Sequence, residues 1–484
     1  MPHDLFIDGQ FVSGQGPVIE ILNPATGAPA ATVAAASPEQ VNVAVDAATQ
    51  AGAGWRLSSQ HERSEALRGI AAELDSQRED IARVLTVDTG RPYARNLVYV
   101  DFAAGVFRQY AELARVLGGR LPPSNDPGQL SLVMRVPYGV VACLIPWNYP
   151  LSLLAFKVAP AIAVGNTVVV KGAAETTLST LRLAFLFAEH TPPGVVNLVA
   201  GDREVGEALV EHPGVDMVAF TGSTATGRAI GATCARLTRP AHLELGGKDP
   251  ALVFDDVDVA RAAQGVAWAA FLNAGQVCTS TERAYVHRAL YDQFVERVAH
   301  LAASLRVGDP MGEKTQVGPM RTEAGRSRVL DQIRQATVQG ARVLAGGAAS
   351  PEPGFFMEPT VLVDVDHTMA IMQHETFGPV LPVMPFADDD EAFALAADTP
   401  YGLGASIYTS DARRVRRGYE ELRVGNLWIN DPVVDNQAAP FGGSRASGNA
   451  RELGVEGLFA FTDIKHVHWN IDLQEKSWWY PYEE

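Results

Sequence analysis

A chain of 484 residues is too long for one ordinary hydrophobic core and predicts two or more domains. Its composition, 47% hydrophobic and 20% charged, is typical of a globular protein, and its apolar runs end before the roughly 20 residues of a membrane span. The net charge of −17 argues against nucleic acid as a partner, because phosphate binding depends on clustered Lys and Arg. Neither a nucleic acid nor a membrane is therefore expected as a partner.

The first residues lack the basic stretch and apolar core of a secretory signal, which predicts a cytoplasmic location. Alternation around Asp8-Gly9 indicates a β-hairpin. The first hundred residues are otherwise mostly helical, with a capping-box start at Ser37–Gln40 and a second helix near Arg63–Leu74. The segment Leu121–Arg135 has two prolines near its start and then alternates, which predicts a protruding hairpin rather than a core strand.

From Tyr138 to Gly247, short β-rich runs alternate with helical patterns, which is typical of a parallel sheet covered by helices. The expected strands are Val140–Ile145, Thr167–Lys171, Val195–Val199, Met217–Phe220 and His242–Leu245. The expected helices between them are Leu151–Val164, Leu178–Glu189, Glu204–Glu211 and Ala225–Cys234.

Beyond Pro250 a second α/β core is expected, with a further βα alternation from Thr360 to about Asn430. Its first helices are expected near Val257–Ala274, Leu290–Leu305 and Thr322–Gln339. The C-terminal tail is rich in aromatic residues, which indicates burial against a partner surface. These are Trp469, Trp478, Trp479, Tyr480 and Tyr482.

The three cysteines cannot form a disulfide framework and lack the close pairing of a structural zinc site, so no metal is expected. Cys278 follows a predicted helix that ends at Gly275, which places its thiol in an accessible turn. A thiol with an ordinary pKa of about 8.5 needs local activation before it can act as a nucleophile. The alternative, a buried Cys that acts as a small hydrophobic residue, is the default for Cys143 and Cys234.

Glu244 leaves the last predicted strand just before Gly246 and Gly247, which allow another backbone or a ligand to come close. A partly desolvated carboxylate there could take a proton from water.

Asn148 stands at the carboxyl end of a strand, where open α/β sheets bind ligands, and its amide could donate to a developing oxyanion. Taken singly, Glu244 fits a surface or capping carboxylate better than a base, whereas Asn148 fits a turn residue equally well and its neighbour Trp147 a core residue.

The run Phe220–Gly227 follows a strand and opens a helix, so its free N–H groups suit a pyrophosphate. It is neither the G-x-G-x-x-G fingerprint nor a P-loop. Together, and in this order, the motifs around Asn148, Phe220–Gly227, Glu244 and Cys278 resemble the aldehyde dehydrogenase superfamily over nearly the whole chain. Further similar stretches are Gly165-Asn166-Thr167 leading to Lys171, Glu375–Pro379, Pro400–Leu403, Pro440–Gly443 and Ser447-Gly448.

The resemblance implies an α/β fold with a Rossmann-type dinucleotide-binding domain, an α/β catalytic domain and a small β oligomerisation element. The dinucleotide-binding domain would comprise residues 1–120 and 136–247, and the catalytic domain residues 248–440. Residues 121–135 and 463–484 would form the oligomerisation element, with 441–462 as a return segment. A homodimer or homotetramer is implied.

The same resemblance implies oxidation of an aldehyde to a carboxylic acid. Cys278 would be the nucleophile, Asn148 would hold the oxyanion together with the Cys278 backbone N–H, and Glu244 would activate water. Lys171 would contact the adenosine ribose, Ser223 and Trp147 the pyrophosphate region, and Glu375 the nicotinamide ribose, with Phe377 beside the ring. Gly222, Ile145, Leu245 and Gly246 complete the expected cofactor-binding set.

Family members specific for NAD often carry Glu three residues after the Lys, where this chain has Ala174, followed by Glu175. The cofactor expected is NAD, with NADP possible.

Related enzymes that accept betaine aldehyde surround its cationic head with a box of aromatic rings. Two positions of that box hold Phe156 and Leu272 in this chain, which favours a neutral aldehyde as substrate. The alternative functions are a Cys-dependent esterase or thioesterase without redox chemistry, and a catalytically idle structural or binding protein of the same fold.

Overall fold

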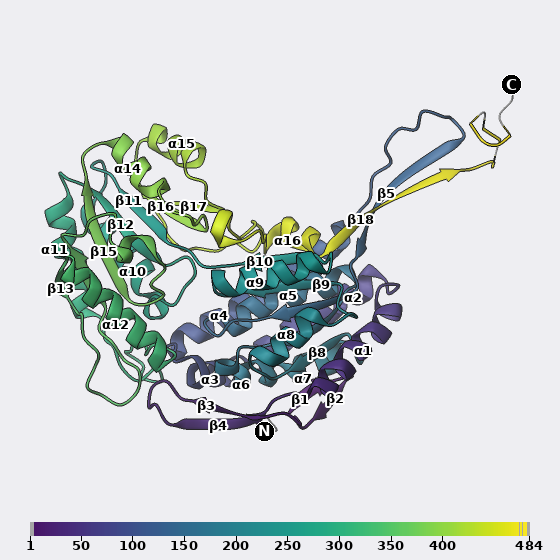
Figure 1. The fold of residues 1–484 in the computed structure, drawn as a ribbon, viewed down its shortest axis with the longest axis horizontal. Coiled ribbons are helices and arrows are strands. Elements are labelled where there is room, and N and C mark those ends of the chain that lie inside the picture. The colour runs from purple at the N-terminus through teal and green to yellow at the C-terminus, as the bar shows by residue number, and fades with distance from the viewer. Residues whose placement is uncertain (1–3, 474, 477, 482–484) are drawn as a thin grey trace.

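The computed structural model describes residues 4–473, 475–476 and 478–481, and Figure 1 shows their arrangement. At the N-terminal end, β1 (Leu5–Ile7) and β2 (Gln10–Val12) pair through a tight turn at Asp8 and Gly9. Both turn residues have positive φ, 51° and 74°, as the favoured two-residue hairpin turns require. The hairpin expected from the sequence is therefore confirmed.

The helices of the first hundred residues follow a short antiparallel pair, β3 (Val18–Leu22) and β4 (Pro29–Ala34). Ser37 and Gln40 form the predicted capping box at the start of the first helix. These helices are α1 (Pro38–Trp55), α2 (Gln60–Ser76), α3 (Arg78–Thr89) and α4 (Tyr93–Leu113), followed by the 3-10 turn η1 (Ala114–Val116).

The first large sheet has seven strands in the order β10-β9-β6-β7-β8-β1-β2, and all neighbours from β10 to β8 are parallel. The five predicted strands are present with bounds shifted by at most one residue: β6 (Val140–Leu144), β7 (Thr167–Lys171), β8 (Val196–Val199), β9 (Met217–Thr221) and β10 (Ala241–Glu244). The strand order reverses between β6 and β9, so the loops after these two strands diverge and leave a ligand-binding crevice.

The connecting helices of this sheet are largely as predicted. The exception is the expected helix Leu178–Glu189, which is broken at Leu183 into two short helices. The helices are α5 (Pro150–Val164), α6 (Thr177–Arg182), α7 (Ala184–His190), α8 (Arg203–Glu211) and α9 (Thr224–Arg236), with the 3-10 turn η2 (Ala174–Thr176) before α6.

The second large sheet also has seven strands, in the order β13-β14-β15-β12-β11-β16-β17, and only the edge strand β13 is antiparallel. Its strands are β11 (Asp249–Val253), β12 (Thr281–His287), β13 (Arg342–Ala345), β14 (Thr360–Val363), β15 (Val380–Phe386), β16 (Gly404–Tyr408) and β17 (Asn426–Ile429). Its helical elements are α10 (Val259–Phe271), η3 (Leu272–Gly275), α11 (Tyr291–Ser304), α12 (Glu323–Val338), α13 (Ala370–Gln373), α14 (Asp389–Ala397) and α15 (Ala412–Glu421). After it come η4 (Arg445–Ser447) and α16 (Gly454–Ala460).

A two-stranded ribbon projects from the body of the molecule (Figure 1). It pairs β5 (Gln129–Pro137) with β18 (Thr462–Asn470) in antiparallel register. The segment 121–135 therefore protrudes as predicted, but the expectation that it forms a hairpin with itself is wrong apart from one bridge between Arg120 and Val133. The two prolines before β5 lack the N–H groups that a ladder needs, so β5 takes the distant C-terminal strand as its partner.

The fold is thus two α/β sheets and a small antiparallel β element, as the sequence predicted. Each large sheet has its own buried apolar cores. Within the described part of the chain, no helix combines the length and the apolar character needed to cross a membrane. Of the predicted aromatic tail residues, Tyr482 lies outside the described residues.

Candidate active site

One cavity of about 280 Å³ gathers nearly all the residues that the sequence predicted to act in catalysis or cofactor binding. Both large sheets contribute to it, through the loops after β6, β9 and β10 and through the segments around η3, α12 and β15. Of the predicted residues, only Lys171 and Ile145 do not line it. The lining consists of Pro146, Trp147, Asn148, Thr221, Gly222, Ser223, Glu244, Leu245, Gly246, Cys278, Arg328, Glu375 and Phe377.

The turn that carries Cys278 is strained. The predicted helix does not continue to Gly275: α10 ends at Phe271, and Asn273 and Ala274 adopt positive φ angles of 52° and 55°. Such backbone costs free energy in residues other than glycine and persists only where its surroundings hold it. Asn273 and Gln276 hold it here through reciprocal bonds, in which Asn273 Nδ2 donates to the Gln276 carbonyl (3.2 Å) and Gln276 Nε2 to the Asn273 carbonyl (2.9 Å).

Cys278 is half-buried, whereas Cys143 and Cys234 are fully buried, as the default interpretation of those two predicted. Burial raises the pKa of the Cys278 thiol well above its ordinary value, and the carboxyl of Glu244 raises it further. The thiol is therefore protonated at neutral pH in the absence of ligands. It needs a base, or a nearby positive charge, to become a nucleophile.

Glu244 ends β10 and is fully buried. Among the described residues neither of its oxygens has a hydrogen-bond partner of ordinary geometry, although the carboxyl interacts with the Cys278 thiol. Burial raises the pKa of Glu244 to about 8, and the charge of Glu452 adds to this shift. An unpartnered carboxyl with a pKa near the operating pH is suited to general-base catalysis.

A buried ion pair lies close enough to act on Glu244. Lys157 of α5 donates to Thr221 Oγ1 (2.6 Å) and forms an ion pair with Glu452, and both charged side chains are almost completely buried. The Lys157 ammonium lowers the pKa of Glu244, which opposes the effect of Glu452. Nothing in the sequence around Glu452 distinguished this residue, because its partner is 295 positions away along the chain.

Asn148 is buried at the end of the loop after β6, and its Nδ2 donates to the Gln276 carbonyl (3.1 Å). Arg91 also fixes this loop, because its Nη2 donates to the Asn148 carbonyl (3.1 Å). The guanidinium carbon of Arg91 lies 4.1 Å from the ring centre of Tyr149 and 4.3 Å from that of Tyr99. Sequence reasoning missed Arg91, which lies far from Asn148 along the chain.

The cofactor side of the cavity offers groups that suit a dinucleotide. Ser223 caps α9 by accepting a hydrogen bond from the Thr226 N–H (3.2 Å), so the N-terminus of this 13-residue helix borders the cavity where a pyrophosphate would bind. Glu375 approaches the glycine turn so closely that a Cβ on Gly246 would lie 2.5 Å from its carboxylate. That carboxylate accepts from the Gly247 N–H (3.1 Å) and could instead bind a ribose hydroxyl.

Trp147 and Phe377 meet edge to face across the cavity, with ring centres 5.5 Å apart. Lys171 ends the neighbouring strand β7, where its ammonium donates to the Gly201 carbonyl (3.0 Å), and Ile145 is buried at the end of β6. Both lie near the carboxyl edge of the same sheet but outside this cavity. Arg328 of α12 lines the cavity and was not predicted, because one Arg on a polar helix carries no motif.

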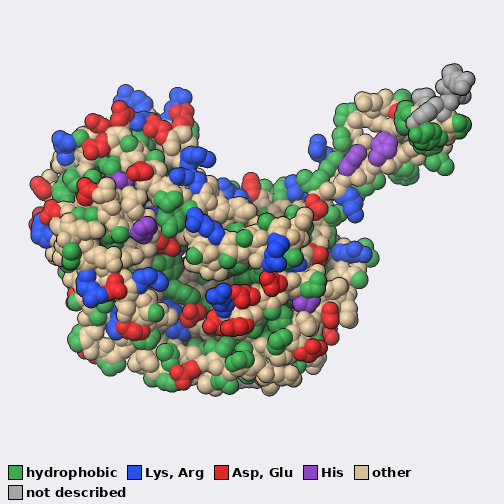
Figure 2. Space-filling model, viewed as in Figure 1, with side chains coloured by type: hydrophobic (Ala, Val, Ile, Leu, Met, Phe, Trp, Pro, Cys, Tyr) green, Lys and Arg blue, Asp and Glu red, His purple; other side chains and the backbone are tan. Residues whose placement is uncertain are grey.

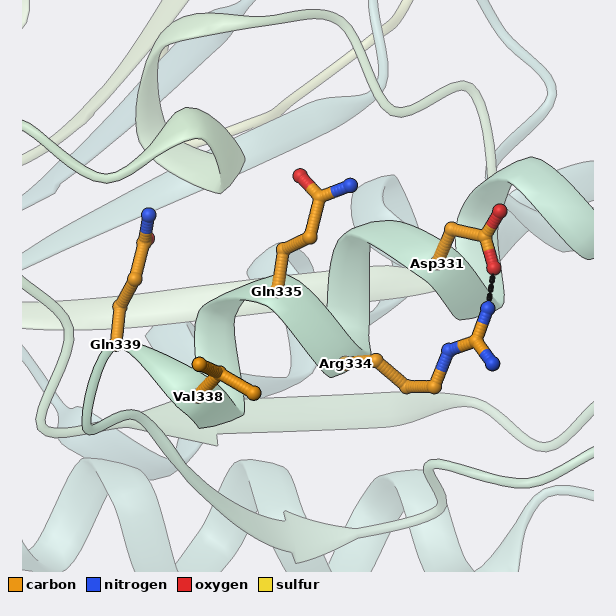
Figure 3. Close-up of a pocket in the computed structure, with 5 residues that line it drawn as sticks. All are labelled: Asp331, Arg334, Gln335, Val338 and Gln339. Carbon is orange, nitrogen blue, oxygen red and sulfur yellow. Dashed lines mark ion pairs between the residues drawn. The ribbon is translucent and has the colours of Figure 1, made fainter.

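A separate hollow of about 410 Å³ lies on the outer face of α12, and Figure 3 shows its lining residues. Asp331 and Arg334 form an ion pair there, beside Gln335, Val338 and Gln339. None of these five side chains is a nucleophile, and none was predicted to act in a site. We therefore assign the chemistry to the cavity at Cys278.

Comparison with known proteins agrees with this geometry. The pattern of the Aldehyde dehydrogenase family matches residues 11–467. A chloroplastic aminoaldehyde dehydrogenase of Arabidopsis thaliana is 39% identical over 479 residues, which cover 96% of this chain and 95% of that protein.

Two solved structures are also similar over nearly their full length. The betaine aldehyde dehydrogenase of Staphylococcus aureus in complex with NAD⁺ has a TM-score of 0.96 at 33% identity, covering 99% of this chain and 96% of that one. An NADP-dependent enzyme of E. coli has a TM-score of 0.94 at 36% identity, covering 96% and 98%.

Proposed function

This chain belongs to the aldehyde dehydrogenase family and is an NAD(P)-dependent aldehyde dehydrogenase, and we propose that Cys278, Glu244 and Asn148 carry its reaction. One observation carries the assignment of roles. The half-buried Cys278 and the fully buried, unpartnered Glu244 share a cavity with the residues suited to bind a dinucleotide. No other described cysteine has such surroundings, because Cys143 and Cys234 are sealed in the interior.

The first half of the reaction depends on the thiol. Glu244 accepts the proton of Cys278, and the thiolate adds to the aldehyde carbon, so that the carbonyl oxygen becomes an oxyanion. The Asn148 amide turns from the Gln276 carbonyl to this oxygen, and the Cys278 N–H donates to it as well. A nicotinamide bound in the cavity would accept the hydride that leaves the substrate carbon, and this carbon would then be the carbonyl carbon of a thioester with Cys278.

The second half releases the acid. Glu244 first releases the Cys278 proton to solvent. Its carboxylate, with a pKa near 8, then takes a proton from a water molecule, and the resulting hydroxide attacks the thioester carbon. The carbon–sulfur bond breaks and Cys278 leaves as a thiolate. Burial is the main cause of this raised pKa, and the charges of Glu452 and Lys157 adjust it in opposite directions although neither residue lines the cavity.

For the cofactor we propose a preference for NAD over NADP. Burial lowers the pKa of the Lys171 ammonium, and the negative charges of Asp202 and Glu175 beside it oppose that shift. They would repel a 2′-phosphate at this end of the site, even though Ala174 stands where NAD-specific members of the family often have Glu. Kinetics with both dinucleotides test this preference.

We also propose that the ribbon of β5 and β18 mediates assembly into a homodimer or homotetramer. It presents exposed apolar side chains, among them Ile464 (61% exposed) and Trp469 (54%), and Figure 2 shows hydrophobic side chains gathered near its tip. The division at residues 120, 135, 247, 440 and 462 into dinucleotide-binding, catalytic and oligomerisation parts is proposed with it. The cytoplasmic location stays a prediction.

For the substrate we propose an aldehyde that carries an amino group. This departs from the neutral aldehyde that the incomplete aromatic box favoured. The aminoaldehyde dehydrogenase of Arabidopsis thaliana supports the proposal through its 39% identity across nearly the whole chain. Reduction of NAD in the presence of 3-aminopropanal tests it directly. If NAD and NADP are reduced with no aldehyde of a broad panel, the alternative of a Cys-dependent esterase or thioesterase replaces the whole proposal.

A further inference from the structure

Three side chains that can bind a metal ion meet between helices α2 and α7. Glu73 belongs to α2, and Glu189 and His190 are the last two residues of α7. One ligand atom of each side chain lies within 4.8 Å of the ligand atoms of the other two. None of the three lines the cavity at Cys278, so this cluster is separate from the candidate active site.

The imidazole of His190 lies against α2 at Gly69. A Cβ on Gly69 would lie 2.5 Å from His190 Nδ1, so the absence of a side chain at this position makes room for the ring. Glu73 follows Gly69 by four residues, which places both on one face of the helix. The other ring nitrogen, Nε2, is shielded from solvent and has no hydrogen-bond partner among the described residues. A buried imidazole nitrogen without a partner is costly unless a ligand satisfies it.

The two carboxylates of the cluster are not neutralised by a cation. Gln77 lies between Glu73 and Arg182: its Nε2 donates to the Glu73 carboxylate, and its Oε1 accepts from Arg182 Nη2 (2.6 Å). The Arg182 guanidinium carbon lies 4.2 Å from the ring centre of Phe185. In the described part of the chain, neither Glu73 nor Glu189 forms an ion pair with Lys, Arg or His. Two carboxylates this close repel each other unless a cation lies between them.

A groove of about 560 Å³ gives an ion access to the cluster, because Glu189 and His190 are among its lining residues. The groove lies between the C-terminal end of α1, the first turns of α2 and the segment after α7. Its wall also includes His61, Glu62 and Glu65. These acidic side chains favour the approach of a cation from solvent.

We propose that Glu73, Glu189 and His190 bind one divalent transition-metal ion, which joins α7 to α2. Two carboxylate oxygens and one imidazole nitrogen suit zinc and its neighbours, with water as a further ligand, whereas Mg²⁺ and Ca²⁺ prefer oxygen ligands alone. Ligand atoms at about 2.0–2.2 Å from one ion lie at most about 4.4 Å apart. A small inward movement of the exposed Glu189 therefore closes the cluster around the ion.

The ion would stabilise the folded protein, because unfolding separates the two helices that supply its ligands. Its role is structural, since none of its three ligands reaches the cavity at Cys278. The inference therefore does not depend on the proposed function.

The test is a titration of the untagged, full-length protein with Co²⁺, followed by calorimetry and by the visible absorption of the bound ion. We expect one Co²⁺ per chain at this site, together with a rise in the thermal midpoint. In Glu189→Gln and in His190→Gln, the affinity should fall at least about tenfold and the rise should disappear. NAD reduction by both variants should equal that of the unaltered protein.

Three control variants should keep the ion. Glu65→Gln alters a carboxylate of the same groove that is already paired with Arg68 (2.5 Å). His466→Gln alters another pair of histidines, with His468, whose ring centres lie 6.4 Å apart. Cys278→Ala removes the half-buried thiol, which is a competing ligand for Co²⁺.

Four results would overturn the inference. They are no Co²⁺ bound by the unaltered protein, full affinity in both Glu189→Gln and His190→Gln, loss of all binding in a control variant, and displacement of Co²⁺ by excess Mg²⁺. The last would mean that the cluster attracts cations through charge alone. Because Glu189 is exposed, Glu189→Gln keeps the test decisive even if His190→Gln fails to fold.

Discussion

The Glu244 carboxyl and the Cys278 thiol share one buried space, and the ionisation of either opposes that of the other. Ionised Glu244 raises the pKa of the thiol, while burial has already raised the pKa values of both groups. Two negative charges in so dry a place are costly, so the pair keeps at least one proton even above pH 8. The pair can pass that proton between nucleophile and base as the reaction requires.

Removing the thiol should separate chemistry from binding. In Cys278→Ala, aldehyde oxidation should be abolished, because no other described cysteine is accessible. Binding of NAD should remain within about threefold, since the α9 N-terminus and Glu375 are unchanged. Isothermal titration with NAD and a steady-state assay measure the two effects. Undiminished turnover would place the nucleophile elsewhere.

The coupling of the pair predicts a shift in thiol reactivity with pH. In Glu244→Gln the charge that opposes the Cys278 thiolate is gone, so the midpoint of iodoacetamide alkylation should move to lower pH. Glu375→Gln is the control, because Glu375 acts on the pKa of Glu244 and is not among the main causes of the Cys278 shift. A midpoint that stays in place or rises in Glu244→Gln would argue against the coupling.

The pH dependence of turnover should follow Glu244. Only its carboxylate can take a proton from water, and its pKa is raised to about 8, so thioester hydrolysis should accelerate as pH rises toward 8. Single-turnover release of the acid, followed from pH 6 to 9, measures this step. A rate that is flat over this range would exclude Glu244 as the base for hydrolysis.

Asn148 should matter in the transition state rather than in binding. In Asn148→Ala, kcat should fall by about 10²-fold or more, as for other oxyanion donors, with a smaller change in KM. The thermal midpoint serves as the structural control, because Asn148 also donates to the Gln276 carbonyl. A fall in kcat of less than about threefold would remove Asn148 from the oxyanion site.

Replacing one partner of the buried ion pair between Lys157 and Glu452 should destabilise the protein. Lys157→Met leaves the Glu452 charge without its partner, and unfolding free energy should fall by about 3–5 kcal/mol. Arg203→Met breaks a surface pair with Glu207, where solvent screens both charges, and should change the unfolding free energy far less. Denaturant unfolding measures both. Equal effects in the two variants would contradict the burial argument.

The local features of this fold were readable from the sequence, and the distant pairings were not. The strands of the first sheet, the Asp8-Gly9 hairpin and the Ser37 cap depend on neighbouring residues, and all were confirmed. The partner of β5 lies more than 300 positions away in β18, and no local pattern carries that information. The strained turn before Cys278 was likewise hidden, because contacts of Gln276 rather than propensity stabilise it.

The site shows the same division. The residues proposed as nucleophile, base and amide donor were predicted from motifs, and the structure places all three around one cavity. Arg91, Arg328 and Glu452 escaped notice, because each is a single charged residue without a motif. Their environments arise only when segments far apart in the chain meet in the folded protein.

The most direct test of covalent catalysis by Cys278 is a mass measurement on Glu244→Gln. This variant lacks the proposed base for hydrolysis, whereas its Cys278 thiol no longer faces the Glu244 charge and can lose its proton to solvent. After mixing with aldehyde and NAD it should therefore produce a burst of NADH equal to the number of sites and retain an acyl group. Digestion should locate that group on the peptide containing Cys278. A burst without an adduct, or an adduct on another residue, would contradict the account.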